Sequence, residues 1–174
     1  MMGPATSGVN PWLLIEASSE GVLRFATVMP SSRPRVSAIH EIPIAGVPTF
    51  TDALQQFERE EGVPLRGLQC AMAIAGAASG ETISLVRSRW TISRAGLMAI
   101  FGTQPVILND VAARAWATRS GTANIEPLRG LGMPSFSRLI IGAPAWRVDQ
   151  HEAVLTGAAE RLAQDMSPSL SVAA

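Results

Sequence analysis

Two adjacent polar residues, Asn109 and Asp110, follow an apolar run at residues 106–108 and have side chains suited to binding hydroxyl groups. The run is typical of a strand buried on both faces of a parallel sheet. Polar residues at the carboxyl end of such a strand lie where α/β sheets bind ligands. There an aspartate can accept a proton from a ligand hydroxyl, and an asparagine can orient neighbouring hydroxyls. A plainer interpretation is that the pair only caps a helix beginning near Val111.

The hydrophobic pattern predicts the elements that must position this pair. Apolar runs predict strands at residues 12–15, 22–29, 35–42, 68–75, 82–86, 106–108 and 138–142. Amphipathic stretches and capping residues predict helices at residues 51–61, 94–101, 111–118 and 151–166. A hairpin followed by helices that alternate with buried strands indicates one α/β domain with a mixed sheet flanked by helices. We expect this domain over residues 11–166, after a disordered or tag-like start at 1–10 and before a frayed tail at 167–174.

Composition limits the function classes. The chain has 174 residues, 47% of them hydrophobic, which suits one domain with a sizeable core. Fourteen basic residues balance fourteen acidic ones, so nothing favours nucleic acid or an anionic membrane as partner. We read no signal peptide and no apolar run near the ~18 residues that span a bilayer, and expect a cytoplasmic protein.

Other reactive side chains are scattered along the sequence. Cys70 is the only cysteine and lies in an apolar run, which indicates a buried core thiol. His40 and His151 are far apart, and no Cys/His spacing is typical of a zinc site. We therefore expect no metal site.

Four stretches together carry a family resemblance. They are Pro-Thr-Phe-Thr-Asp-Ala-Leu at 48–54, an apolar strand with a small-residue turn at 70–80, Arg-Ser-Arg-Trp-Thr-Ile-Ser at 87–93, and Val-Ile-Leu-Asn-Asp-Val-Ala-Ala at 106–113. Their order and spacing resemble the small, sugar-side domain of the bacterial glucokinase family. The resemblance implies a single ribonuclease-H-like, actin-like ATPase domain of the kind found in hexokinases.

The resemblance also implies roles for individual residues. Asp110 is at the position of the general base that activates the sugar hydroxyl, and Asn109 is at a sugar-binding position. Gly76, in the small-residue turn, and Arg87 are further candidate sugar-binding residues. The family has an asparagine where Arg87 stands, and arginine is larger and always charged. A solvated surface arginine is an equally good interpretation of Arg87.

A turn near the start of the chain departs from the family pattern. The family has an aspartate and a Gly-Gly-Thr turn that approaches the ATP phosphates, where a Cβ would block the backbone N–H groups. Here the turn reads Glu16, Ala17, Ser18, Ser19, Glu20 and Gly21. Serines replace the paired glycines, and Glu20 would repel a triphosphate by about 1 kcal/mol or more at ~4 Å. We expect no cofactor, with ATP and Mg²⁺ implied only if kinase activity survives.

A further departure from the family pattern lies in the second half of the chain. Residues 138–144 resemble the family strand that leads into a large second domain. Residues 153–162 follow almost directly and are similar to the family's C-terminal helix, which returns to the small domain. The sequence thus predicts a small domain without the large one, closed by that helix, which covers an otherwise exposed apolar sheet face.

Three hypotheses for function follow. The first is a catalytically inactive glucokinase-like protein, acting as a regulatory or interaction module that retains weak binding of a hexose or related sugar. The second is a sugar kinase whose site is completed by a partner chain. The third is a structural domain that forms a homodimer through its former interdomain face. Trp90, Trp116 and Trp146 are candidates for such a face, although each is more typical of core packing.

Overall fold

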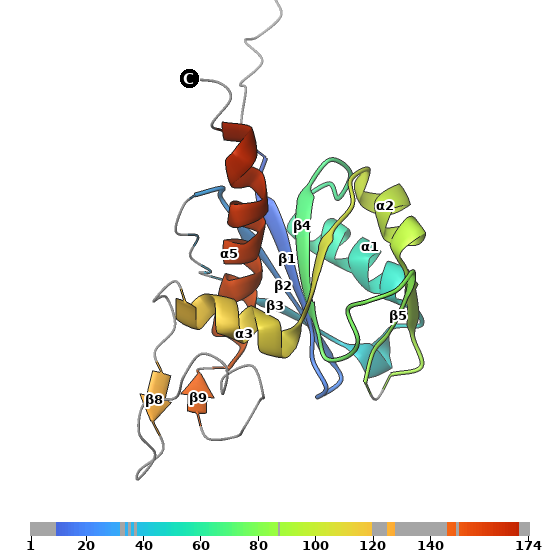
Figure 1. Cartoon of the computed structure of the whole chain (residues 1–174). Helices are drawn as coiled ribbons and strands as arrows, with labels where there is room; N and C mark the ends of the chain where they lie inside the picture. Colours follow the sequence, from blue (N-terminus) through green and yellow to red (C-terminus); the bar gives the residue numbers. More distant parts are fainter. Residues whose placement is uncertain are drawn as a thin grey trace, which may run out of the picture.

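The computed structural model describes residues 10–31, 34, 36, 38–86, 88–119, 125–127, 146–148 and 150–170. A five-stranded mixed sheet forms its centre (Figure 1). In spatial order the strands are β3 (His40–Pro43), β2 (Val22–Val28), β1 (Trp12–Ala17), β4 (Gln69–Ile74) and β7 (Val106–Asn109). The first three strands are antiparallel, whereas β1, β4 and β7 are parallel. The predicted α/β class and mixed sheet are confirmed.

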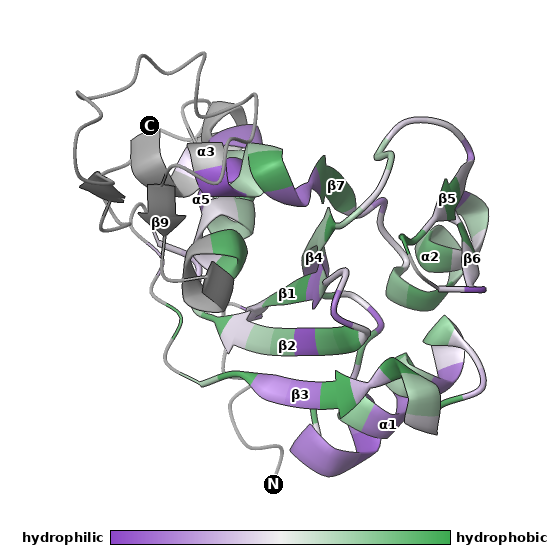
Figure 2. Cartoon of the chain, turned by 90° about the horizontal axis from the view of Figure 1, so that it is seen from below, coloured by the Kyte–Doolittle hydropathy of each residue, from purple (hydrophilic) through white to green (hydrophobic). Residues whose placement is uncertain are grey.

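Helices cover both faces of the sheet (Figures 1 and 2). On one face lie α1 (Phe50–Glu61) and α2 (Arg94–Phe101), and on the other α3 (Asp110–Arg119) and α5 (Gln150–Leu170). The remaining elements are a 3-10 turn at Ile44–Gly46, the hairpin β5 (Thr82–Ser84) and β6 (Thr91–Ser93), and the hairpin β8 (Ile125–Pro127) and β9 (Trp146–Val148). Among the described helices, none is long and apolar enough to cross a membrane.

Local signals in the sequence set the ends of α1 and α2. Thr49 caps α1, because its hydroxyl accepts a hydrogen bond from the backbone N–H of Asp52 at 3.2 Å. Ser93 caps α2 in the same way. Both helices end at a glycine in the left-handed conformation, Gly62 with φ +66° and Gly102 with φ +75°. The predicted cap at Ser93 is confirmed, whereas α1 begins one residue earlier than expected.

Elements that depend on a distant partner were predicted less well. Of the strand expected at 35–42, the structure describes β3 at His40–Pro43, where His40 pairs with Phe25 of β2. The short strands β6, β8 and β9 were not predicted, since three residues carry little local signal without their partner. The helix α5 continues to Leu170, beyond the expected end at 166. The strand expected at 138–142 lies outside the described residues.

Alternating side chains divide the core into two layers. Leu13 and Ile15 of β1 pack toward α1, whereas Trp12 and Leu14 pack toward α5. Five α5 side chains are fully or almost fully buried in the second layer: Val154, Leu155, Ala158, Ala159 and Leu162. The last helix therefore covers an apolar sheet face, as the resemblance of residues 153–162 implied. Cys70 is buried as expected, and burial raises the pKa of its thiol.

Candidate functional site

The carboxyl ends of the three parallel strands lie in one row. Ala17 of β1 is paired with Ile74 of β4, and Ile74 is paired with Asn109 of β7. The chain segments that follow these residues therefore leave the sheet at the same edge. This edge is where an α/β sheet presents polar groups to a ligand, and Asn109 and Asp110 lie there as predicted. The strand before them was expected to be buried on both faces, but β7 is the last described strand of the sheet and its four residues are only partly buried.

Asn109 has both ends of its amide bonded to backbone. Its Nδ2 donates to the carbonyl oxygen of Gly76 at 2.9 Å, and its Oδ1 accepts from the backbone N–H of Val111 at 2.9 Å. The second bond caps α3, so the capping interpretation is correct for Asn109. The first bond joins the end of β7 to the end of β4, which local sequence signals did not indicate.

Asp110 is the first residue of α3 and keeps a partly exposed carboxylate. Its side chain is 21% exposed, and its Oδ2 lies 3.6 Å from Nη1 of Arg114, one helical turn further on. An ion pair of this length between partly exposed groups is weak. The carboxylate can therefore still accept a hydrogen bond from a ligand hydroxyl.

Gly76 is a glycine because two backbone segments approach each other closely. It forms an isolated antiparallel bridge with Leu85, and a Cβ on Gly76 would lie 2.6 Å from the backbone oxygen of Ser84. No residue with a side chain fits at that distance without a shift of the backbone. The small residue at this position is thus required by the β5–β6 hairpin, whatever the site binds.

Three backbone N–H groups of the turn between β1 and β2 donate hydrogen bonds within the hairpin itself. The N–H of Ser18 donates to Val22 O at 3.2 Å, that of Glu20 to the Ser18 hydroxyl at 3.3 Å, and that of Gly21 to Ser18 O at 3.4 Å. The Ser18 hydroxyl also donates to Val22 O at 3.2 Å. A turn that binds phosphate needs such N–H groups directed at the ligand.

Three carboxylates, those of Glu16, Glu20 and Glu41, lie around the guanidinium of Arg24 beside this turn. We call these four residues the Arg24 cluster. The guanidinium lies 2.6 Å from Glu41, 3.1 Å from Glu20 and 3.5 Å from Glu16. Glu16 and Arg24 are paired across β1 and β2, and their side chains are only 2% and 7% exposed. The carboxylate of Glu16 is therefore engaged with an arginine.

Opposing effects act on the charge of Arg24. Burial lowers the pKa of its guanidinium, but hydrogen bonds to Glu41 and Glu20 and the nearby charge of Glu16 outweigh that effect, so the pKa is raised above its ordinary value. Arg24 is thus permanently charged in the folded protein. Arg24 was not among the predicted site residues, although a lone arginine between apolar residues of a strand is a signal for a buried ion pair.

The other residues singled out from the sequence have different surroundings. Arg87 lies outside the described residues, as does the side chain of Trp146. Trp90 is buried, and its Nε1 donates to Pro48 O at 2.9 Å. Trp116 is partly buried under the guanidinium of Arg161, 5.5 Å from the ring centre. Core packing is therefore the correct interpretation of Trp90.

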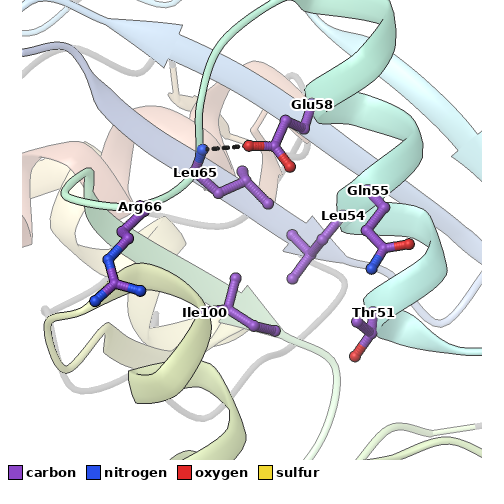
Figure 3. Close-up of a pocket in the computed structure, with 7 residues that line it drawn as sticks. All are labelled: Thr51, Leu54, Gln55, Glu58, Leu65, Arg66 and Ile100. Carbon is purple, nitrogen blue, oxygen red and sulfur yellow. Dashed lines mark hydrogen bonds between the residues drawn. The ribbon is translucent and has the colours of Figure 1, made fainter.

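A hollow of about 220 Å³ lies away from this edge, between α1 and α2 (Figure 3). It is lined by Thr51, Leu54, Gln55, Glu58, Leu65, Arg66 and Ile100. One carboxylate oxygen of Glu58 accepts from the backbone N–H of Leu65 at 3.0 Å, so that side chain holds the turn before β4. None of the predicted site residues lines this hollow. Within the described part of the chain, no group of three acidic, histidine or cysteine residues is arranged to bind a metal ion.

The strand order, the three parallel strand ends and the polar β7–α3 junction define a domain of the actin-like ATPase fold, the class that includes sugar kinases. The family model described as Glucokinase matches residues 21–145, and the chain belongs to the glucokinase family. No curated protein sequence gives a significant match.

Two solved structures are similar to parts of this chain. A glucokinase from an Antarctic psychrotroph is similar with a TM-score of 0.57 and 18% sequence identity, over 72% of this chain. A putative sugar kinase from Cytophaga hutchinsonii gives a TM-score of 0.46 and 15% identity, over 62% of this chain and 38% of that one. The chain spans 41% of the length of the psychrotroph glucokinase.

Proposed function

We propose that this domain binds a hexose or a related sugar and does not transfer phosphate by itself, and that it acts as a regulatory or interaction module. The principal observation is the state of the turn between β1 and β2. Its N–H groups at Ser18, Glu20 and Gly21 are used within the turn, and Glu16 faces Arg24. These residues do not fit an ATP–Mg²⁺ complex, because the triphosphate would meet carboxylates in place of free N–H donors.

The surroundings of Asp110 support the proposal that the domain binds a sugar. Asp110 has a partly exposed carboxylate at the carboxyl edge of the parallel strands. A sugar hydroxyl can donate a hydrogen bond to that carboxylate, and a charge-assisted bond of this kind is among the stronger polar contacts. Binding through one such group is expected to be weak, because water competes for the same hydrogen bonds.

A kinase completed by a partner chain is the second candidate. The chain spans 41% of a glucokinase, so a partner supplying the remainder is consistent with the length of the match. Such a partner would not replace the turn of residues 16–21, because that turn belongs to this domain. We therefore favour the sugar-binding module, with a second copy or another protein as its interaction partner.

Thermal melting and tryptophan fluorescence test the proposal. The full chain is titrated with glucose and related sugars, with and without ATP–Mg²⁺, because a ligand that binds only the folded state raises the melting temperature. We expect a rise with a sugar that is lost in Asp110→Asn. The matched control is Asp165→Asn, since Asp165 also pairs with an arginine one turn away, Arg161, at 3.0 Å.

The outcomes separate the candidates. A rise with ATP–Mg²⁺ contradicts our account of the turn and favours a kinase. A sugar response that Asp110→Asn and Asp165→Asn affect equally contradicts the role of Asp110. No response to any sugar contradicts sugar binding and leaves protein interaction alone.

A further inference from the structure

One arginine at the start of α2 binds the loop that follows β4. Nε of Arg94 donates to the carbonyl oxygen of Gly80 at 2.7 Å, and its Nη2 donates to that of Ala78. The backbone N–H of Arg94 donates to Glu81 O at 3.0 Å. Three carbonyl groups of the loop at residues 77–81 are therefore bonded to a single residue. No other hydrogen bond joins this loop to the described part of the chain.

The position of Arg94 is not explained by the needs of its own helix. Arg94 is the first residue of α2, directly after the Ser93 cap, and a cation there opposes the helix dipole. A guanidinium carries several N–H donors in a fixed planar arrangement, so it can bind two carbonyl oxygens at once. The bonds to the loop therefore account for an arginine at this place.

The loop begins beside the candidate sugar site. It follows Gly76, whose carbonyl oxygen accepts from Nδ2 of Asn109 at 2.9 Å, and Asp110 is the next residue after Asn109. Gly76 also bridges to Leu85, so the backbone is fixed on both sides of the loop. Most residues of the loop itself are small and exposed. Such a segment has low local stability, so its bonds to Arg94 decide its shape.

We propose that Arg94 is a positioning residue for the sugar site. It holds the loop at residues 77–81 in one shape beside the junction of β7 and α3, and this shape limits the space open to a ligand at that edge. Arg94 need not contact the ligand for this role. The attachment of the loop stands without a sugar, whereas the effect on ligand affinity rests on the proposed function.

A conservative substitution separates the bonds of Arg94 from its charge. Arg94→Lys keeps a long, positively charged side chain but presents one nitrogen where arginine presents a planar fork. The matched control is Arg89→Lys, the same change at an exposed arginine just before β6. Arg89 has no hydrogen bond or ion pair with the residues that the structure describes.

The first measurement needs no ligand. A glutamate-specific protease cleaves after Glu81 when the loop leaves its folded shape. We expect this cleavage to be about fivefold faster in Arg94→Lys and unchanged in Arg89→Lys, because only Arg94 holds the loop. Cleavage after Glu61, at the end of α1, is the internal reference. Equal cleavage after Glu81 in the wild type and both variants would overturn the attachment.

The second measurement is glucose affinity, at a temperature where the wild type and both variants are folded. We expect binding to be about fivefold weaker in Arg94→Lys and unchanged in Arg89→Lys. By reciprocity, glucose should slow cleavage after Glu81 in the wild type, which a purely structural role would not produce. An unchanged affinity in Arg94→Lys would overturn the positioning role. If the wild-type chain binds no glucose, the proposed function fails and this role fails with it, while cleavage still decides whether Arg94 holds the loop.

Discussion

The turn between β1 and β2 and the junction between β7 and α3 lie at the same edge of the sheet, yet their polar groups are engaged differently. At the turn, the N–H groups of Ser18, Glu20 and Gly21 are bonded internally and Glu16 is buried against Arg24. At the junction, Asn109 is bonded to backbone but Asp110 remains partly exposed. The two regions thus differ in how far their polar groups are already engaged within the domain.

The largest expected effect is at the turn. Arg24→Met removes the guanidinium beside Glu16 and should lower the free energy of unfolding by about 3–5 kcal/mol, because a carboxylate then stays buried without its cation. Urea denaturation measures this loss. The double variant Arg24→Met, Glu16→Gln should recover part of it. A loss below about 1 kcal/mol in the single variant would mean that the Arg24 cluster does not hold the turn.

The next effect is at the junction. Gly76→Ala places a Cβ 2.6 Å from Ser84 O and should cost about 2–3 kcal/mol in chemical denaturation, since two backbone segments must separate. Gly46→Ala is the matched control, because no atom lies within 4 Å of a Cβ there. Equal stability of the two variants would contradict the close approach at Gly76.

A pH titration tests the buried thiol of Cys70 in β4, the strand that lies between β1 and β7. The pKa of Cys70 is raised by burial, so the folded protein disfavours its thiolate. This contribution is fully present below the unfolded pKa, near 9, and is lost above it, by about 1.4 kcal/mol of unfolding free energy per pH unit. Cys70→Ala should remove that slope between pH 9 and 11. An identical slope in the variant would assign the alkaline loss to other groups.

The smallest expected effect on stability is at the ion pair between Asp110 and Arg114, which we compare with the pair between Glu16 and Arg24. Arg114→Gln removes the partner of Asp110 at 3.6 Å, where both side chains are partly exposed, and should lower stability by less than about 0.5 kcal/mol. The same denaturation experiment measures it beside Arg24→Met. A loss as large as that of Arg24→Met would show that Asp110 is as firmly engaged as Glu16.

Local sequence signals predicted the parts of the fold that depend on near neighbours. The Ser93 cap and Gly102 stop of α2 and the run before Asn109 are of this kind. The pairing of Glu16 with Arg24, and the bond from Asn109 to Gly76, join residues brought together by strand register. The lone Arg24 signals a buried ion pair, but the partners in both contacts depend on register, which the turn and the packing of the whole sheet set together.

Isothermal titration calorimetry of the full chain tests the difference between the two regions most directly. Glucose and ATP–Mg²⁺ are titrated separately, and Asp110→Asn is measured beside the wild type. We predict binding heat with glucose that is lost in Asp110→Asn, and none with ATP–Mg²⁺. Binding of ATP–Mg²⁺ by the wild-type chain, or formation of a sugar phosphate when both ligands are present, would contradict the account.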